Sequence, residues 1–292
     1  MKILLGCINV NSLGGSEMYH YELARELYLL GNDITLLSLR DIDPTDEKRI
    51  ALTALGVKQV DLRTINTTER YDIVVASQPQ VNQFTLQHFS QTPIISIIHS
   101  EIRSEDPILD PRILHYVAIR QPIANLLVDG YNIPQEKVSL IYNPIDKARF
   151  NLQDKKPLEK YSGVFVGGEC NDPIRFKAIQ HLAQECIKQD WDLYIMSDSR
   201  YDFNHPNIKF IDKTWHTEHF LKQMNFTAGI LLGRTTLEGW CCGIPGYMYI
   251  INQYGDILSI ETEAPEAIET LCDSRYVAEQ HINLYKQILN EY

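Results

Sequence analysis

The sequence predicts an α/β protein made of two doubly wound domains, each built on a mainly parallel sheet. Its 292 residues exceed the usual length of one domain and suit two domains of about 150 residues each. In both halves, short apolar runs alternate with helical patterns, which is typical of βαβ units. A polar stretch at residues 150–161 separates the two series and predicts a linker. We therefore place a first domain at residues 1–152, a second at 153–275 and a terminal segment at 276–292.

The first half contains six short apolar runs with the length of buried strands. We expect strands at residues 2–6, 34–38, 72–76, 94–98, 114–118 and 138–142. Between the first two, four side chains recur at helical spacing: Tyr19, Leu23, Leu27 and Leu30. Ser16 is positioned to cap the start of this helix, and Gly31 to end it. The pattern predicts a complete βαβ unit at the beginning of the chain.

The second half repeats this rhythm and ends in a helical segment. We expect strands at residues 163–166, 193–196, 207–211 and 228–232. A helix follows the first of them and carries Ile179, Leu182, Ala183 and Cys186 on one side. Residues 274–292 have the apolar spacing of one further helix. Because open parallel sheets bind ligands at the carboxyl ends of their strands, we expect the functional site in a cleft between the two domains.

Composition argues against several classes of protein. A net charge of −11 and a pI near 5.3 disfavour a passive electrostatic grip on nucleic acid or anionic lipid. No apolar run approaches the roughly 20 residues that span a bilayer, and the start shows no signal-peptide pattern, so we expect a cytoplasmic protein.

The six cysteines lack metal-site or disulfide spacing, and we expect reduced thiols in the core. The one DxD-like string, at residues 41–43, lies in a polar stretch; we expect a solvated loop there and no metal site.

A glycine pair precedes the first helix. The loop of residues 9–15 ends in Gly14 and Gly15, which would let the backbone approach a phosphate or sugar at the helix N-terminus. The alternative is a tight strand-to-helix turn with no ligand. The loop lacks the third glycine of a dinucleotide-binding fingerprint, and the chain has no GK[ST] phosphate loop, HExxH or GxSxG motif. Dehydrogenase, P-loop and serine-hydrolase chemistry therefore have no support.

A second constellation lies at residues 233–245, GRTTLEGWCCGIP, directly after an apolar strand. This segment predicts a short helix closed by a GxP turn. Thr235 and Thr236 can cap the helix, while its free amides can meet a diphosphate. Glu238, one turn in, can accept hydrogen bonds from a ribose diol. The alternative is that Arg234 and Glu238, four residues apart, only form a surface ion pair.

These residues resemble a known family. LEGWCCGIP at residues 237–245 is similar to the C-terminal signature of the retaining GT-B glycosyltransferases of the group 1, family 4-like type. Three further segments occur in the order found in that family: GGSE at 14–17, IYNPID at 141–146 and VGG at 166–168. The resemblance spans nearly the whole chain. It implies a GT-B fold: two Rossmann-like domains that face each other across a cleft, and a C-terminal helix that packs back on the first.

The resemblance also implies roles for individual residues. Glu238 would hold the donor ribose, and Arg175 and Lys177 would neutralise the diphosphate leaving group, unless they only form a solvated helix face. His99, at the end of a strand, would contact the transferred sugar or support its oxocarbenium-like state, although a lone histidine there is often structural. The remaining expected donor-binding residues are Gly14, Gly15, Gly168, Arg234, Thr235 and Thr236. No protein nucleophile is nominated.

Two positions depart from the family pattern. Ile230 occupies the place of a glutamate that contacts the transferred sugar in many members, and Glu169 replaces the arginine expected after Gly168. We expect a retaining, metal-independent transferase that uses a nucleoside diphosphate sugar, UDP- or GDP-linked, as co-substrate and needs no cofactor. A sugar-nucleotide epimerase of the same fold and a non-catalytic sugar-nucleotide-binding protein are the alternatives. The acceptor is open: saccharide, protein or small molecule, with modified nucleic acid less favoured.

Overall fold

The computed structural model describes residues 1–101, 106–167, 173–198, 203–252 and 254–292. The chain forms two compact units. Unit 1 comprises Met1–Pro144 together with Leu271–Tyr292, and unit 2 comprises Ile145–Thr270. The polar stretch at 150–161 belongs to unit 2. Among the described residues, no helix combines the length and apolar character needed to cross a membrane.

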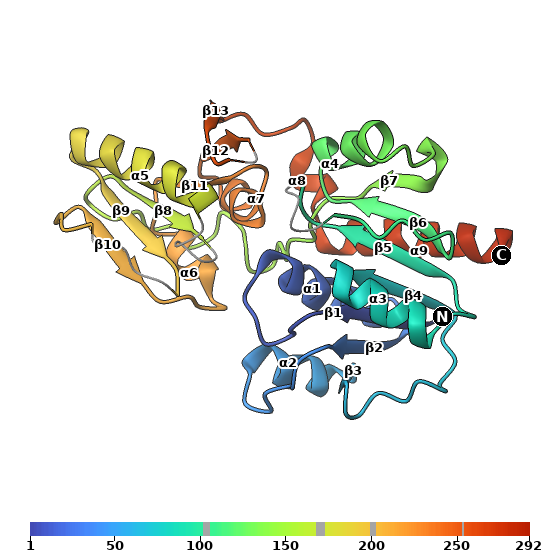
Figure 1. The fold of residues 1–292 in the computed structure, drawn as a ribbon. Helices are drawn as coiled ribbons and strands as arrows, with labels where there is room; N and C mark the ends of the chain where they lie inside the picture. Colours follow the sequence, from blue (N-terminus) through green and yellow to red (C-terminus); the bar gives the residue numbers. More distant parts are fainter. Residues whose placement is uncertain (102–105, 168–172, 199–202, 253) are drawn as a thin grey trace. The chain divides into compact units, whose positions relative to one another are not determined.

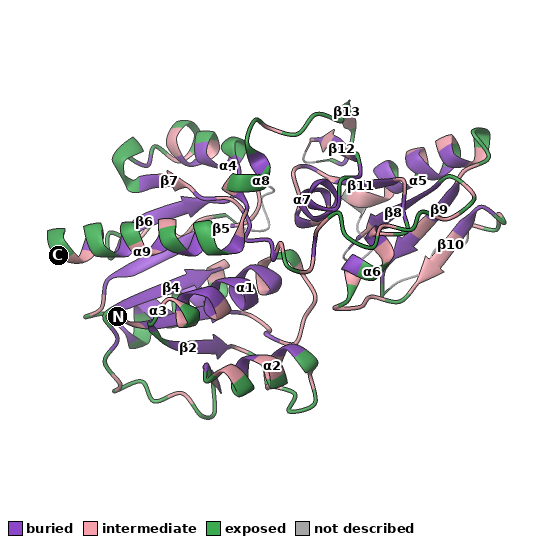
Figure 2. Cartoon of the chain, turned by 180° about the vertical axis from the view of Figure 1, so that it is seen from behind, coloured by how far each residue is buried: buried purple, intermediate pink, exposed green. Residues whose placement is uncertain are grey.

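Unit 1 is built on a seven-stranded, wholly parallel sheet (Figure 1). Its order is β3-β2-β1-β4-β5-β6-β7. The strands are β1 (Lys2–Cys7), β2 (Asp33–Ser38), β3 (Lys58–Asp61), β4 (Ile73–Ser77), β5 (Ile94–Ile98), β6 (Ile113–Ala118) and β7 (Val138–Leu140). The central strands are buried along their whole length, as Figure 2 shows, which explains why they are continuous apolar runs in the sequence.

Helices connect and cover these strands. They are α1 (Gly15–Leu29), α2 (Glu47–Leu55), α3 (Pro79–His88), α4 (Gln121–Asn125), the π-helix η2 (Leu126–Gly130), the short 3₁₀ turn η3 (Gln135–Lys137) and α9 (Ser274–Glu291). The expected cap of α1 was wrong: its N-cap is Gly14, and the Ser16 hydroxyl instead donates to Glu17 at 2.8 Å. Gly31, with φ of +83°, ends the segment as predicted.

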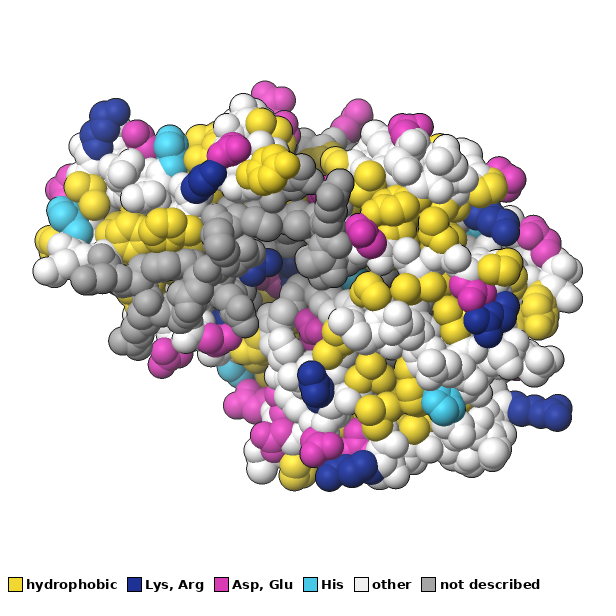
Figure 3. All heavy atoms as spheres, in the orientation of Figure 1, with side chains coloured by type: hydrophobic (Ala, Val, Ile, Leu, Met, Phe, Trp, Pro, Cys, Tyr) yellow, Lys and Arg dark blue, Asp and Glu magenta, His cyan; other side chains and the backbone are white. Residues whose placement is uncertain are grey.

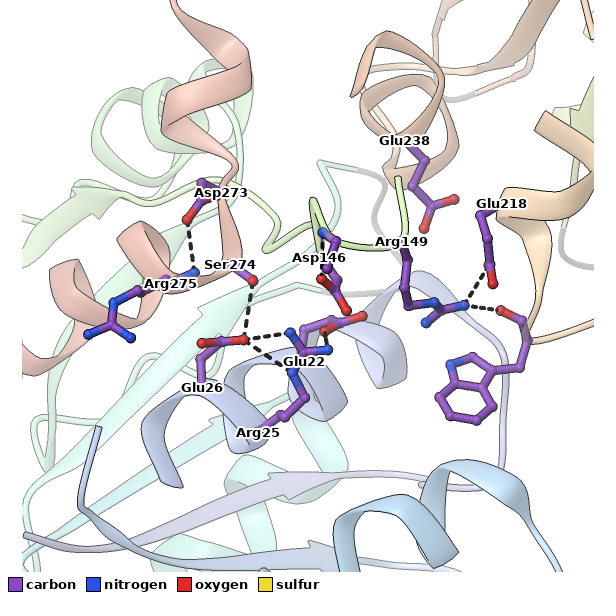
Figure 4. Close-up of polar contacts among 12 residues, drawn as sticks. Glu22, Arg25, Glu26, Asp146, Arg149, Glu218, Glu238, Asp273, Ser274 and Arg275 are labelled. Atoms are coloured by element: carbon purple, nitrogen blue, oxygen red, sulfur yellow. Dashed lines mark hydrogen bonds and ion pairs between the residues drawn. The ribbon is translucent and has the colours of Figure 1, made fainter. Parts of the chain in front are cut away.

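The C-terminal helix α9 packs against α1 within unit 1, as the family resemblance implies. Asp273 caps α9 by accepting from the backbone amides of Arg275 and Tyr276, each at 3.1 Å. Figure 4 shows Ser274 at the first position of the helix bonded to Glu26 of α1, at 3.4 Å. Deeper in the contact, the hydroxyl of Tyr19 lies 2.6 Å from Nε2 of His281, both fully buried.

Unit 2 holds a six-stranded sheet of order β10-β9-β8-β11-β12-β13. Its pairs are parallel except that of β12 with β13. The strands are β8 (Ser162–Val166), β9 (Asp192–Met196), β10 (Ile208–Ile211), β11 (Phe226–Ile230), β12 (Gly246–Ile251) and β13 (Ile257–Glu261). The helices are α5 (Pro173–Lys188), α6 (Thr217–Leu221), α7 (Arg234–Cys241) and α8 (Ile268–Leu271), which ends where the chain returns to unit 1. Two Rossmann-like sheets therefore carry the fold that the sequence predicts.

Helix α7 begins and ends by backbone geometry. Its N-cap is Gly233, so the expected capping by Thr235 or Thr236 was wrong. At the other end, the amide of Gly243 donates to Trp240 O at 2.9 Å and that of Ile244 to Gly239 O at 3.0 Å, a Schellman motif. Gly243 has φ of +63°, which favours glycine. The GxP turn closes the helix as predicted.

Candidate functional site

The order of the strands indicates where a ligand site is expected in each unit. In unit 1 the strand order reverses between β1 and β4, and in unit 2 between β8 and β11. Open α/β sheets bind ligands beyond the carboxyl ends of their strands at such a reversal. The loop carrying Gly14 and Gly15 leaves β1, and α7 follows β11, so both motifs singled out in the sequence lie at reversals. The units are described separately below.

In unit 1, Gly15 leaves open space at the start of α1. A Cβ atom built on Gly15 would meet no described atom within 4 Å, and its φ is not positive. The backbone therefore does not need glycine there, which weakens the alternative of a mere tight turn. At Gly14 a Cβ would lie 2.5 Å from Glu17 Oε2, the end of a flexible side chain. The open position favours close approach of a ligand.

His99, directly after β5, belongs to a series of three hydrogen-bonded polar groups, of which Ser77 and His20 are fully buried and His99 is partly exposed. Its Nε2 lies 2.9 Å from the Ser77 hydroxyl, and that hydroxyl lies 3.2 Å from His20 Nε2. Nδ1 of His20 lies 2.9 Å from the carbonyl oxygen of Ser16. Burial lowers the pKa of His20, and burial, with the charges of His20 and Arg120, lowers the pKa of His99 well below 6.5. Both rings are neutral at pH 7.

These hydrogen bonds determine which nitrogen of His99 carries the proton. Because a carbonyl oxygen only accepts, His20 Nδ1 carries the proton and His20 Nε2 is an acceptor. Ser77 must donate its single proton to that nitrogen, so it accepts from His99 Nε2–H. His99 Nδ1 is therefore unprotonated. It has no hydrogen-bond partner among the described residues.

A second buried acceptor lines the same small cavity as His99. Asn82 donates its amide to Gln78 O at 3.1 Å and to the Ser96 hydroxyl at 3.0 Å, which fixes the orientation of its carboxamide. Its Oδ1 is buried and lacks a partner in the described part of the chain. His99, Gln78 and Asn82 all line this cavity. Two acceptors that meet no donor from the described ranges favour a hydroxyl or water as occupant.

In unit 2, Arg234 and Glu238 form a buried pair on α7. Arg234 Nε donates to Glu238 Oε1 at 2.6 Å, and the two side chains are only 8% and 6% exposed. The sequence analysis gave a surface ion pair of these two residues as the alternative to a ligand site. The two side chains do pair, but the pair is buried. Burial raises the pKa of Glu238, whereas Arg234 acts to lower it. A buried carboxylate is a strong acceptor for hydroxyl groups.

The two threonines differ. Thr236 is fully buried, and its hydroxyl has no hydrogen-bond partner within the described ranges. It faces the sheet, because a Cβ on Gly246 of β12 would lie 2.5 Å from its methyl group. Thr235 is partly exposed. Because Thr236 faces the sheet, its side chain is not positioned to contact a ligand at the N-terminus of α7. The partly exposed side chain of Thr235 can still contact such a ligand.

Sequence reasoning missed Arg149 and Glu218. Arg149 Nη2 donates to Glu218 Oε2 at 2.7 Å and to Trp215 O at 2.6 Å, as Figure 4 shows. Figure 4 also places Glu238 beside this pair, and the charge of Arg149 acts to lower the pKa of Glu238. Nothing in the spacing of residues 149, 218 and 238 reveals this cluster, since three separate elements bring it together.

The predicted diphosphate cations lie on the first turns of α5. Lys177 donates to Tyr254 O at 3.2 Å and pairs with Asp256; the two side chains are about half exposed. Such an exposed pair is weak and readily exchanged for another anion. Arg175 lies two residues earlier, so the two side chains point to different sides of the helix. Gly168 lies outside the described residues.

The structure describes most of the charged residues and cysteines that the composition singled out. On the face in Figure 3, Lys and Arg side chains stand mostly apart, with Asp and Glu among them. Asp41 and Asp43 are exposed outside helices and strands, as predicted for a solvated loop. The described cysteines are buried free thiols: Cys7, Cys186, Cys241, Cys242 and Cys272.

A family model matches part of the first half of the chain. Residues 13–149 match the family model described as Glycosyltransferase Family 4. No curated protein sequence matches the chain.

Solved structures resemble the whole chain. A glycosyltransferase from Rickettsia africae ESF-5 is 12% identical, with a TM-score of 0.67 over 100% of this chain and 99% of that one. A variant of S. aureus TarM, in complex with Fondaparinux, alpha-GlcNAc-glycerol and UDP, is 9% identical, with a TM-score of 0.64 over 100% and 97%. A putative UDP-N-acetylglucosamine 2-epimerase from Listeria monocytogenes is 11% identical, with a TM-score of 0.58 over 99% and 97%. The predicted resemblance to GT-B glycosyltransferases is confirmed by the family-model match over residues 13–149 and by the fold; retention of configuration stays a prediction.

Proposed function

We propose that this chain, which has the GT-B glycosyltransferase fold, transfers a sugar from a nucleoside diphosphate sugar to an acceptor. The observation that carries the proposal is the buried Glu238, one turn into the helix that follows β11 at the strand-order reversal of unit 2. A ribose diol offers two O–H donors to such a carboxylate. The N-terminus of α7, where backbone amides point towards a ligand position, favours a diphosphate beside it. A UDP- or GDP-linked donor fits this arrangement.

The same proposal assigns the leaving-group charge to α5. Negative charge develops on the nucleoside diphosphate as the glycosidic bond breaks, and Lys177 could exchange Asp256 for that phosphate. Arg175 faces another side of the helix and is the weaker candidate. We propose retention of configuration without a metal in this step. In unit 1, the open space at Gly15 and the unprotonated Nδ1 of His99 suit sugar hydroxyls.

The test combines nucleotide binding with turnover. We expect UDP or GDP to raise the melting temperature of the purified chain. Glu238→Gln should weaken nucleotide binding about 10- to 100-fold, the effect of losing a hydrogen bond to a charged group. Lys177→Ala should lower turnover of the donor more than its affinity. Lys188→Ala, at the other end of α5 and 69% exposed, is the matched control and should behave as wild type.

Gly15→Ala probes unit 1 in the same assay. Alanine fits the open space without a clash and should leave stability unchanged or slightly higher, yet reduce turnover if a ligand approaches there. Absence of any nucleotide response, or wild-type behaviour of both Glu238→Gln and Lys177→Ala, would refute the assignment. Binding without turnover would favour a non-catalytic sugar-nucleotide-binding protein, and conversion of the donor to its epimer without an acceptor would favour the epimerase.

A further inference from the structure

A cluster of two histidines and a glutamate lies on one turn of unit 2, before and within α6. We propose that His216, Glu218 and His219 bind a divalent transition-metal ion, with Zn²⁺ as the best fit. One ligand atom from each lies within 4.8 Å of the others. The inference goes beyond the proposed transferase activity and does not rest on it. The sequence analysis expected no metal site.

The backbone of the turn brings the two imidazoles to one side. His216 is the N-cap of α6, and the amide of His219 donates to His216 O at 3.2 Å. Residues three apart in a helical turn lie on the same face. The two rings are accordingly stacked, with centroids 5.5 Å apart and planes 15° from parallel. Glu218 lies between the two histidines in the sequence, and its carboxylate lies close to both rings in space.

The distances are close to those that a tetrahedral ion requires. His216 Nδ1 lies 3.4 Å from Glu218 Oε1, and His219 Nε2 lies 4.0 Å from the same oxygen. Metal–ligand bonds of about 2.0–2.1 Å place tetrahedral ligands roughly 3.4 Å apart. The histidine side chains are 46% and 70% exposed, so small rotations can bring the donor atoms to that spacing.

The carboxylate is held in place by a partner on its other oxygen. Arg149 bonds Glu218 Oε2 at 2.7 Å, and both histidines approach Oε1 (Figure 4 draws the arginine side of this arrangement). Glu218 itself is only 9% exposed. A neighbour that orients a ligating carboxylate is a common feature of metal sites in proteins. The glutamate is therefore fixed, and the exposed histidines adjust.

The donor set selects the kind of metal. Two imidazole nitrogens with one carboxylate suit Zn²⁺, Co²⁺, Ni²⁺ or Cu²⁺, whereas Mg²⁺ and Ca²⁺ prefer sets made of oxygen atoms. Three protein ligands leave a fourth position for water or an exogenous ligand. The expected site therefore has one ion per chain.

The test uses Co²⁺ as a spectroscopic probe on the full chain, prepared without a histidine tag. We expect visible absorption bands that saturate at one Co²⁺ per chain, are displaced by Zn²⁺ and are unaffected by excess Mg²⁺. His216→Ala and His219→Ala should each weaken Co²⁺ binding at least tenfold. Both side chains are exposed, so the variants should fold. His88→Ala, an exposed histidine of unit 1, is the matched control and should bind as wild type.

Two outcomes would overturn the proposal: no saturable Co²⁺ or Zn²⁺ binding at micromolar concentration, or binding that both histidine variants retain. A second readout is quenching of tryptophan fluorescence by Ni²⁺, because the Trp215 ring lies 5.3 Å from that of His216. Nucleotide binding is not part of either readout, so failure here leaves the proposed transferase function standing.

Discussion

At the scale of single residues, hydrogen-bond direction decides what His99 can do. Its Nε2 is committed to Ser77, and its unprotonated Nδ1 borders a cavity. The low pKa of His99 makes the ring a poor base at pH 7, so acceptance of a hydroxyl hydrogen bond suits it better than proton abstraction. A neutral ring also lends no positive charge, which disfavours the expected support of an oxocarbenium-like state.

Two substitutions at His20 should control this tautomer. His20→Leu removes the acceptor for Ser77, so the serine is free to donate to His99 Nε2 and the proton of His99 should move to Nδ1. His20→Gln keeps an oxygen that can accept from Ser77 and should leave the tautomer unchanged. Long-range ¹H–¹⁵N NMR of ¹⁵N-histidine-labelled protein distinguishes the two forms. An unchanged His99 spectrum in His20→Leu would show that Ser77 does not transmit the choice.

The sequence singled out His99 and Glu238 as candidate site residues, with Arg234 beside Glu238, but not the other residues around them. His99 follows a strand, and Glu238 precedes a GxP turn, so local patterns exposed both. His20 and Ser77 stand 57 residues apart and become neighbours only through the strand order β1-β4-β5. Arg149 and Glu218 are likewise 69 residues apart. Such partners are set by tertiary packing, which periodicity does not encode.

At the scale of elements, buried and parallel strands were predictable and edge strands were not. Runs such as residues 94–98 are apolar because both faces of β5 are covered. The sequence analysis missed β3, a four-residue edge strand of mixed polarity, and β13, an exposed antiparallel edge. It also missed β12, which begins directly after the GxP turn. The helix N-caps failed because glycine backbone, rather than the nearby hydroxyls, begins α1 and α7.

One element holds the loop of the first motif in place. Lys48 of α2 is 3% exposed, and its ammonium donates to Asn11 O at 3.0 Å, to Ser12 O at 3.2 Å and to Asp46 at 3.1 Å. These contacts tie the loop between β1 and α1 to α2. The position of Gly14 and Gly15 therefore depends on a side chain more than 30 residues away.

Lys48→Met should loosen this loop. Methionine fills the same volume without the ammonium, so we expect a loss of about 2–4 kcal/mol in the free energy of unfolding, from several hydrogen bonds made by a charged group. Backbone amides of residues 9–15 should also exchange faster. Urea unfolding and hydrogen exchange measure the two effects. Lys58→Met, which removes a 49% exposed partner of Glu69, is the control and should cost less than about 1 kcal/mol. Equal losses of unfolding free energy in the two variants would contradict the role of Lys48 in holding this loop.

At the scale of the whole molecule, acid should act strongly on unit 1. Burial lowers the pKa of four histidines of unit 1. The pKa of His115 falls to about 4 and that of His281 to about 3, and the pKa values of His20 and His99 are also lowered. The unfolded chain binds protons at these groups near pH 6.5, and the folded chain does not. Stability is therefore fully present above pH 6.5 and is lost as the pH falls towards the folded values. Each such histidine contributes up to about 1.4 kcal/mol per pH unit within its window.

His281 tests this linkage at the contact between α9 and α1. His281→Gln keeps an oxygen to accept from Tyr19 but cannot be protonated, so the slope of unfolding free energy against pH between 6 and 4 should fall by about 1.4 kcal/mol per unit. Hydrogen exchange in α1 and α9 follows unit 1. The three tryptophans, Trp191, Trp215 and Trp240, all lie in unit 2, so their fluorescence serves as an internal control. An unaltered slope in the variant would mean that protonation of His281 does not drive acid unfolding, and the buried Tyr19–His281 pair would then be only a packing contact.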